Sequence, residues 1–124
     1  EMCIRDRCMF VQGKNNVFDL DWNNEGVKYK EVFFQAEKEF SAYNFEFANT
    51  DTLLKNFDST ENECKSLLEK KLSLPAYDQC LKASHIFNLL DARGVIGVAE
   101  RTGYITRIRE LAKGCGSLWL SSQN

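Results

Sequence analysis

The spacing of apolar positions along the chain predicts a helical protein. After Tyr29, apolar residues recur at three- and four-residue steps, which places them on one face of a helix that ends near Ala48. These residues are Val32, Phe33, Ala36, Phe40, Tyr43 and Phe47. Phe34 and Phe45 fall on the opposite side. Because both faces carry large aromatic side chains, we expect this helix to be covered twice, within the fold or by a partner.

Two more helices follow. Asn49, Thr50 and Asp51 are possible N-caps for a second helix, whose apolar face is formed by Leu53, Leu54, Phe57, Cys64, Leu67, Leu68 and Leu72. Its polar residues, including Asp58, Glu61 and Lys65, are expected on a solvated surface. Pro75 suits the first turn of a third helix with Ser73 as a possible cap, and a break is expected at Asn88 or Asp91.

A fourth helix is predicted from Val98 to about Leu120. Its apolar stripe consists of Tyr104, Ile105, Ile108, Leu111, Ala112, Cys115 and Trp119. Near the N-terminus, Val17, Leu20 and Trp22 alternate with polar residues, which indicates a short strand or an extended connection. The pattern as a whole predicts a mainly α fold.

Composition narrows the class of protein. With 124 residues, of which 44% are apolar and 27% charged, the chain can form one modest core, so we expect one globular unit or a piece of one. No apolar run is long enough to span a bilayer and no signal peptide is recognisable, which favours the cytoplasm. The cysteines form no C-x-x-C pair, so we expect reduced, packed thiols and no metal site; they are Cys3, Cys8, Cys64, Cys80 and Cys115.

Charge is unevenly distributed. Residues 19–69 contain twelve acidic and five basic side chains, a balance of −7, whereas residues 70–124 contain four acidic and eight basic ones, a balance of +4. Either the C-terminal half faces an anionic partner, or the two halves attract each other within one fold. The pattern leaves both interpretations open.

Basic residues concentrate between positions 87 and 113. On a helical wheel Arg107 flanks one edge of the apolar stripe, Arg109 and Lys113 flank the other, and Arg101 points into it. We therefore expect Arg101 to be a partly buried ion-pair partner of Asp91, Glu100 or a helix C-terminus. Arg109 and Lys113 are candidates for contact with a nucleic-acid backbone, with a solvated helix face as the alternative.

Local chemistry alone predicts no enzyme. His85 is the only histidine, and it has no cysteine or second histidine nearby in the sequence. We therefore expect it to be a core or edge residue and neither a base nor a metal ligand. No nucleophile elbow, phosphate loop or metal-spaced cluster is present.

Longer strings carry a resemblance. MFVQG and VFDLDW, then EVFFQAEKEFSAYNFEFANTD, then LPAYDQCLKASHIFNLLDARG and VAERTGYITRIRELAK resemble, in this order and spacing, the C-terminal part of the bacterial glycyl-tRNA synthetase alpha subunit. The resemblance covers about residues 9 to 120. It implies a class II aminoacyl-tRNA synthetase that activates glycine with ATP and Mg²⁺ and attaches it to tRNA(Gly). It also implies an alpha-subunit homodimer, a separate beta subunit, and an antiparallel catalytic core followed by a helical appendage.

The chain departs from the family where the catalytic core should end. The family's third class-defining motif, Gly-Leu-Glu-Arg, has Cys3, Ile4, Arg5 and Asp6 in its place, so an anion replaces the arginine that holds the ATP phosphates. We therefore carry over no catalytic residue. Residues 1–8 are expected to be foreign to the native protein, 9–26 to be the end of the catalytic core with at most a short strand remnant, and 27–124 to be the C-terminal helical domain.

The resemblance gives the remaining candidates a role. Arg107, Arg109 and Lys113 are expected to approach tRNA or the beta subunit, and Phe34 and Phe45 to face the missing core or a neighbouring subunit. The fragment alone is expected to be inactive and to bind neither ATP nor Mg²⁺. The alternative is a free-standing helical adaptor that binds RNA or protein and has no ligase activity.

Overall fold

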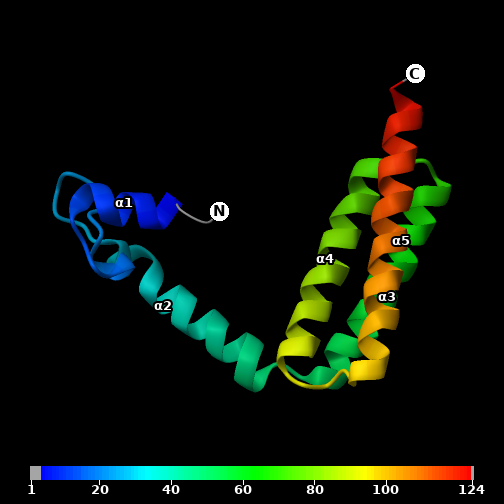
Figure 1. The fold of residues 1–124 in the computed structure, drawn as a ribbon, viewed down its shortest axis with the longest axis horizontal. Helices are drawn as coiled ribbons and strands as arrows, with labels where there is room; N and C mark the ends of the chain where they lie inside the picture. Colours follow the sequence, from blue (N-terminus) through cyan, green and yellow to red (C-terminus); the bar gives the residue numbers. More distant parts are fainter. Residues whose placement is uncertain (1–3, 124) are drawn as a thin grey trace. The chain divides into compact units, whose positions relative to one another are not determined.

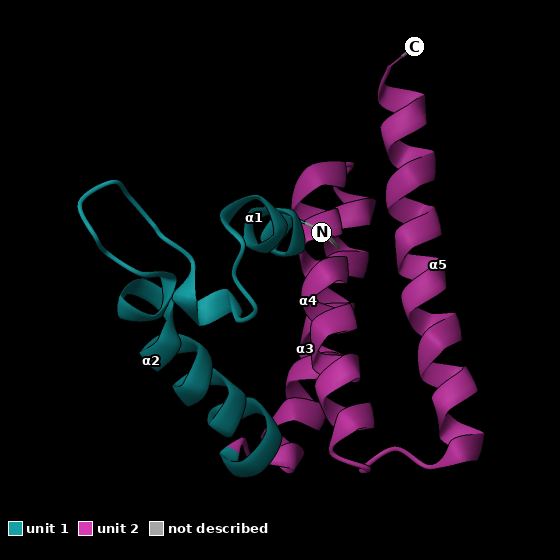
Figure 2. Cartoon of the chain, turned by 60° about the vertical axis from the view of Figure 1, so that its left-hand side comes forward, with its two compact units in different colours: residues 1–47 teal, residues 48–124 magenta. Residues whose placement is uncertain are grey.

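The computed structural model describes residues 4–123, and these residues confirm the mainly α fold (Figure 1). Within this range the regular elements are all helical, and the sheet hydrogen bonding is limited to one isolated antiparallel bridge between Asp21 and Lys28. The chain divides into two compact units, Glu1–Phe47 and Ala48–Asn124, which Figure 2 shows in different colours.

The first unit contains α1 (Ile4–Gln12), the short 3₁₀ helix η1 (Val17–Asp19), α2 (Tyr29–Ala42) and the π-helical turn η2 (Tyr43–Phe47). Of the two alternatives expected around Val17–Trp22, a short strand or an extended connection, the strand does not form: Val17–Asp19 is a 3₁₀ helix, and Asp21 takes part only in the isolated bridge to Lys28. The Asn16 side chain accepts a hydrogen bond from the Phe18 N–H at 2.9 Å, which caps η1 and turns the chain away from an extended course. An Asx cap of this kind overrides the alternation of apolar residues.

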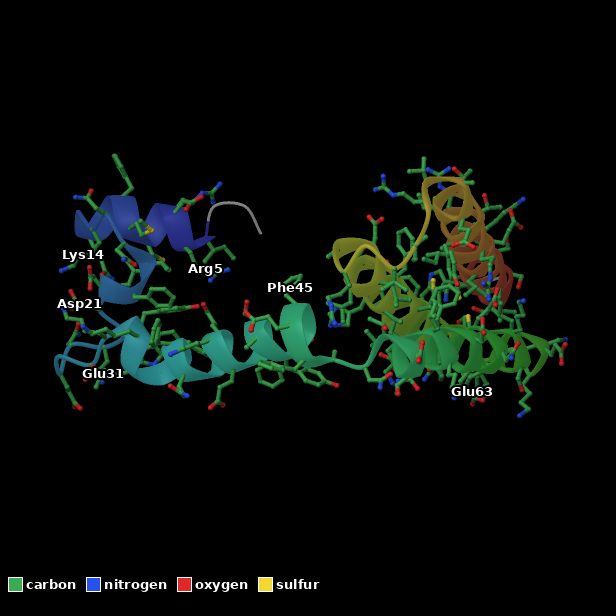
Figure 3. All side chains as sticks on the ribbon, turned by 90° about the horizontal axis from the view of Figure 1, so that it is seen from below. Arg5, Lys14, Asp21, Glu31, Phe45 and Glu63 are labelled. Carbon is green, nitrogen blue, oxygen red and sulfur yellow. The ribbon has the colours of Figure 1, made fainter. Side chains whose placement is uncertain are left out.

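Polar contacts and ring contacts hold the first unit together. The side-chain amide of Gln12 forms two hydrogen bonds with the backbone of Asp21. Its Oε1 accepts from the Asp21 N–H at 2.8 Å, and its Nε2 donates to the Asp21 carbonyl at 3.2 Å. Lys14 and Asp21 form an ion pair with 3.8 Å between Lys14 Nζ and Asp21 Oδ2, and Figure 3 shows the two residues side by side. Neighbouring rings pack edge-on or tilted at centroid distances of 4.9–6.3 Å; they belong to Phe18, Trp22, Tyr29, Phe33 and Phe34.

This unit has almost no buried core. Leu20, at 5% exposure, is the one buried side chain among its described residues. The predicted apolar stripe of α2 exists, but no residue of that helix is buried, and Phe40 and Phe47 are 66% and 76% exposed. α2 is therefore an amphipathic helix whose apolar face lies largely open.

The second unit is a three-helix bundle of α3 (Thr50–Glu69), α4 (Ser73–Ala92) and α5 (Val98–Ser122) (Figures 1 and 2). The three predicted helices of this half are confirmed. Asn49 is the cap of α3, because its side chain accepts a hydrogen bond from the Thr52 N–H at 3.0 Å. α5 continues past the turn between α3 and α4 in both views, so its last turns project beyond the other two helices.

Two predicted boundaries of α4 are wrong. Ser73 is the first helical residue instead of the cap, which is Leu72. The helix does not break at Asn88 or Asp91 but runs to Ala92. It ends where Gly94 adopts a φ of 68°, because this left-handed residue allows the Val95 N–H to bond back to the Leu90 carbonyl.

The bundle core has two layers. The layer nearer the α4–α5 loop is built around Phe57 and Leu90, with Tyr104 and Ile108 of α5 packed against it. The other layer contains Cys64, Ala76, Cys80, Leu111 and Cys115. These three thiols are buried as predicted, whereas Cys8 is exposed and Cys3 lies outside the described residues. Burial raises the pKa of Cys64 to about 12, so this thiol stays protonated and donates to the Ala76 carbonyl at 3.1 Å.

Candidate functional site

Arg107 joins α5 to α3. Its Nε donates to both carboxylate oxygens of Glu61 at 3.1 and 3.2 Å, and its Nη2 donates to Glu61 and, at 2.7 Å, to Asp58. The guanidinium also lies over the rings of Phe57 and Tyr104, 4.7 and 5.1 Å from their centroids. Arg107 is therefore engaged in a structural contact within the bundle.

Electrostatics agree with this geometry. Glu61 is only 6% exposed, so the expectation of a solvated side chain at this position is wrong. The hydrogen bonds from Arg107 hold the pKa of Glu61 below its ordinary value, and the same pairing raises the pKa of Arg107. Both groups are charged at neutral pH, and Lys65 at 3.2 Å adds a second cation beside Glu61.

Arg101 meets Asp91, with its Nη2 3.3 Å from a carboxylate oxygen. The expected partial burial is wrong, because the Arg101 side chain is 56% exposed. The helical wheel places Arg101 in line with the apolar stripe, but the first turn of α5 has no buried residue, and Val98 is 92% exposed. A stripe position is buried only where another helix faces it.

Arg109 and Lys113 lie on the exposed side of α5, one helical turn apart. In the described part of the chain neither cation forms an ion pair. Beside them, α4 and α5 enclose an open groove of about 300 Å³. Its lining is mostly apolar and includes Leu74 and Tyr77 of α4 and Trp119 of α5. Cations without an ion pair thus lie beside an apolar surface here.

His85 lies in a different groove, between α3 and α4, of about 470 Å³. The polar lining of this groove includes Asn56, Ser59 and Thr60, together with an i,i+4 ion pair between Asp78 and Lys82 at 3.1 Å. His85 is exposed, which fits an edge residue. Among the described residues there is also no cluster of three His, Cys, Asp or Glu side chains that could hold a metal ion.

The residues that the resemblance sets against the family's third motif lie at the start of α1. Ile4, Arg5 and Asp6 are exposed helical residues, and Cys3 lies outside the described range. Arg5 Nη1 donates to the Tyr29 hydroxyl at 3.2 Å and lies 3.5 Å from Glu37 Oε1. Asp6, which the resemblance sets against the family's phosphate-binding arginine, is exposed at the surface of this helix.

Comparison with known families decides the identity. Residues 4–124 match the sequence model of the family described as glycyl-tRNA synthetase alpha subunit. The chain belongs to the glycyl-tRNA synthetase alpha subunit family. The resemblance read from the sequence strings is thereby confirmed, while the boundaries 1–8, 9–26 and 27–124 remain predictions.

The family assignment places the helices within a tRNA synthetase alpha subunit. None of the helices in the described part of this family member combines the length and apolarity that crossing a bilayer requires. The predicted interface aromatics differ in their surroundings. Phe34 packs edge-on against Phe18 with a centroid distance of 5.0 Å, whereas Phe45, the central residue of η2 and labelled in Figure 3, is 54% exposed.

Sequence reasoning missed Glu61 and the groove. Glu61 follows Phe57 by four residues and precedes Cys64 by three, so its position on the apolar face of α3 was readable from the spacing. A carboxylate at such a position calls for a cation from another element. The groove had no comparable signal, because it is formed by residues of α4 and α5 that lie about forty positions apart in the sequence.

Proposed function

We propose that the intact protein is the alpha subunit of glycine–tRNA ligase, which uses ATP and Mg²⁺ to activate glycine and transfers it to tRNA(Gly). In this proposal it works in the cytoplasm as an alpha-subunit homodimer with a separate beta subunit and follows class II chemistry. The observation that carries the proposal is the family match, which extends over residues 4–124.

We further propose that the chain itself contributes architecture instead of chemistry. The most strongly bound charged groups of the bundle, Arg107 and Glu61, are committed to each other. At the position of the phosphate-binding arginine, the carboxylate of Asp6 would repel a triphosphate. These residues do not fit ATP, so no catalytic step is assigned to them.

The inactivity of this chain is tested by glycine-dependent exchange between ATP and pyrophosphate. The 124-residue chain alone should give no exchange above a boiled control. Measurable exchange that requires glycine and Mg²⁺ would overturn the assignment of the chemistry to another part of the protein.

The function itself is tested on the whole protein. The full-length alpha subunit that contains residues 9–124, mixed with the beta subunit from the same genome, should charge a tRNA(Gly) transcript with glycine and reject alanine and serine. If this mixture does not charge tRNA although both proteins are folded, the helical adaptor without ligase activity becomes the better description.

A further inference from the structure

We propose that the groove between α4 and α5 is a docking site for an acidic amphipathic helix of the beta subunit. This inference rests on the proposed function, since it takes the companion subunit of the synthetase as the partner. Seven of the described residues line the groove, one of which, Cys115, belongs to the buried core. We define the α4–α5 groove by the other six: Ser73, Leu74, Tyr77, Ala112, Gly116 and Trp119.

Large apolar side chains form the walls of the groove and remain open to solvent. Leu74 is 65% exposed, Tyr77 48% and Trp119 45%. Leu72 and Leu120, which neighbour these residues in the sequence, are also exposed. A contiguous apolar surface of this kind on one face of a bundle is typical of a protein interaction site.

Small residues lie between these walls. Ser73 of α4 and Ala112 and Gly116 of α5 carry little or no side chain, and a Cβ atom added at Gly116 would meet no other atom within 4 Å. Helices approach each other closely where small residues alternate with large ones. The α4–α5 groove therefore has room for the side chains of a third helix laid along it.

Exposed cations lie close in the sequence to the groove residues of both helices. Arg109 and Lys113 lie on α5 within three or four residues of Ala112 and Gly116, on the same exposed face. Lys70 and Lys71 are exposed in the turn that leads into Leu72 and Ser73. An occupant with carboxylates along its edges would complement these four cations, which a second copy of the same groove would not.

The lining favours a protein helix over RNA. A nucleobase placed in the groove would need several hydrogen-bond partners for its edges, whereas the polar groups of the six groove side chains are limited to the hydroxyls of Ser73 and Tyr77 and the indole N–H of Trp119. Leucine, valine or aromatic side chains of a helix need no such partners. We therefore assign the groove to the beta subunit. Binding of tRNA at the groove would contradict this assignment.

The test measures binding of the 124-residue chain to the purified beta subunit of the same genome by isothermal titration calorimetry. Gly116→Leu fills the groove floor. The double variant Arg109→Glu, Lys113→Glu replaces two positive charges beside the groove with negative ones. Each should raise the Kd at least about tenfold. Raising the salt concentration should weaken binding of the parent more than that of the double variant.

Two matched controls separate docking from folding. Gly103→Leu changes another glycine of α5, where an added Cβ atom would also meet no other atom within 4 Å. Gly103 lies on about the opposite side of the helix from the groove. Lys38→Glu with Lys55→Glu reverses two exposed cations elsewhere. Both controls should bind the beta subunit within about twofold of the parent, and all variants should keep the helical circular dichroism of the parent.

Three results would overturn the proposal. The first is that the parent chain does not bind the beta subunit. The second is equal affinity of groove variants and controls. The third is loss of tRNA(Gly) binding in the groove variants while beta-subunit binding is unchanged, which would make the surface an RNA site. Charging of tRNA by the full-length assembly is a separate measurement, so loss of the proposed function is distinguishable from loss of the docking site.

Discussion

Arg107 and Arg101 lie on the same helix and each meets a carboxylate, yet only one of these pairs is sheltered from water. Glu61 is nearly buried beneath Arg107 and two aromatic rings, whereas Arg101 and Asp91 face solvent. Removing one partner of a sheltered pair leaves a charge without its counterion in a poorly solvated place, while an exposed pair is replaced by water.

Arg107→Ala should therefore destabilise the bundle by about 1–3 kcal/mol. The lower part of this range allows for the Arg107 side chain being 37% exposed. The matched variant Arg101→Ala should change stability by no more than about 0.5 kcal/mol. Urea unfolding followed by circular dichroism measures both. Equal losses in the two variants would contradict the structural role given to Arg107.

The same contact predicts a pH dependence. Because the pKa of Glu61 is lower in the folded state than its ordinary value of 4.5, the stability it contributes is present above that value and is lost as pH falls through the folded pKa. Glu61→Gln should thus be less stable than the parent at neutral pH.

The difference in unfolding free energy between the parent and Glu61→Gln should become smaller as the pH falls from about 5 to about 3. Urea midpoints of both proteins across this range test the expectation. A gap of constant size would show that the charge of Glu61 is not what the contact depends on.

At the scale of elements, the two helix ends of the bundle use the same motif with different residues. α3 ends with the Lys71 N–H bonded to the Leu68 carbonyl and the Leu72 N–H bonded to the Leu67 carbonyl, and α4 ends in the same way at Gly94 and Val95. Both motifs need a left-handed residue, and here the φ angles are 60° at Lys71 and 68° at Gly94.

Lys71→Gly should therefore stabilise the protein by about 0.5–1 kcal/mol. The left-handed conformation costs a lysine about 1–2 kcal/mol, and the greater freedom of glycine in the unfolded chain returns part of this difference. Gly94→Ala should destabilise by about 1 kcal/mol for the converse reason. Thermal unfolding of both variants tests the pair, and stabilisation by Gly94→Ala would be inconsistent with its φ.

The spacing of apolar residues predicted helices correctly where two helices pack against each other. The helices of the second unit could be predicted because Phe57, Cys64 and Leu111 recur at helical steps and are buried in fact. Apolar spacing misled at Val17–Asp19, where a side-chain cap produces a 3₁₀ helix in place of a strand, and local polar residues misled at the end of α4, where Asn88 and Asp91 remain helical. Local polar residues do not reveal whether a neighbouring helix supports the turn.

The candidate site was less predictable than the helices. The wheel correctly separated Arg107 from Arg109 and Lys113, but it could not show that Asp58 and Glu61, more than forty residues earlier, meet Arg107. Nor could it show that Arg101 lies in a turn without a facing helix. Contacts of this kind depend on the rotation and length of whole helices and are not contained in the periodicity of one.

At the scale of the whole molecule, the two units differ in how much they bury. The bundle encloses Phe57, Leu90 and Cys64 completely, whereas α2 contributes no buried residue. Local stability follows the number of buried apolar contacts that an opening must break. The two units should therefore differ in the protection of their amides.

Hydrogen exchange measures this difference. Amides of α2 should exchange at least about a hundredfold faster than those in the middle of α3 and α4. Phe57→Ala should accelerate exchange in α3, α4 and α5 and leave α2 unchanged, since the cavity lies in the bundle core. Equal protection of α2 and the bundle would mean that the aromatic stripe of α2 is covered in solution.

The order in which the helices leave the ribosome has a consequence for the bundle. α3 and α4 are complete before the 25 residues of α5 are made, and at about 5–20 residues per second this takes roughly 1–5 s. During that interval Phe57 lacks the Tyr104 ring and Glu61 lacks its guanidinium. The apolar side of α3 and α4 therefore stays uncovered until the last helix has been made, and completion of the bundle waits for the end of its own segment of the chain.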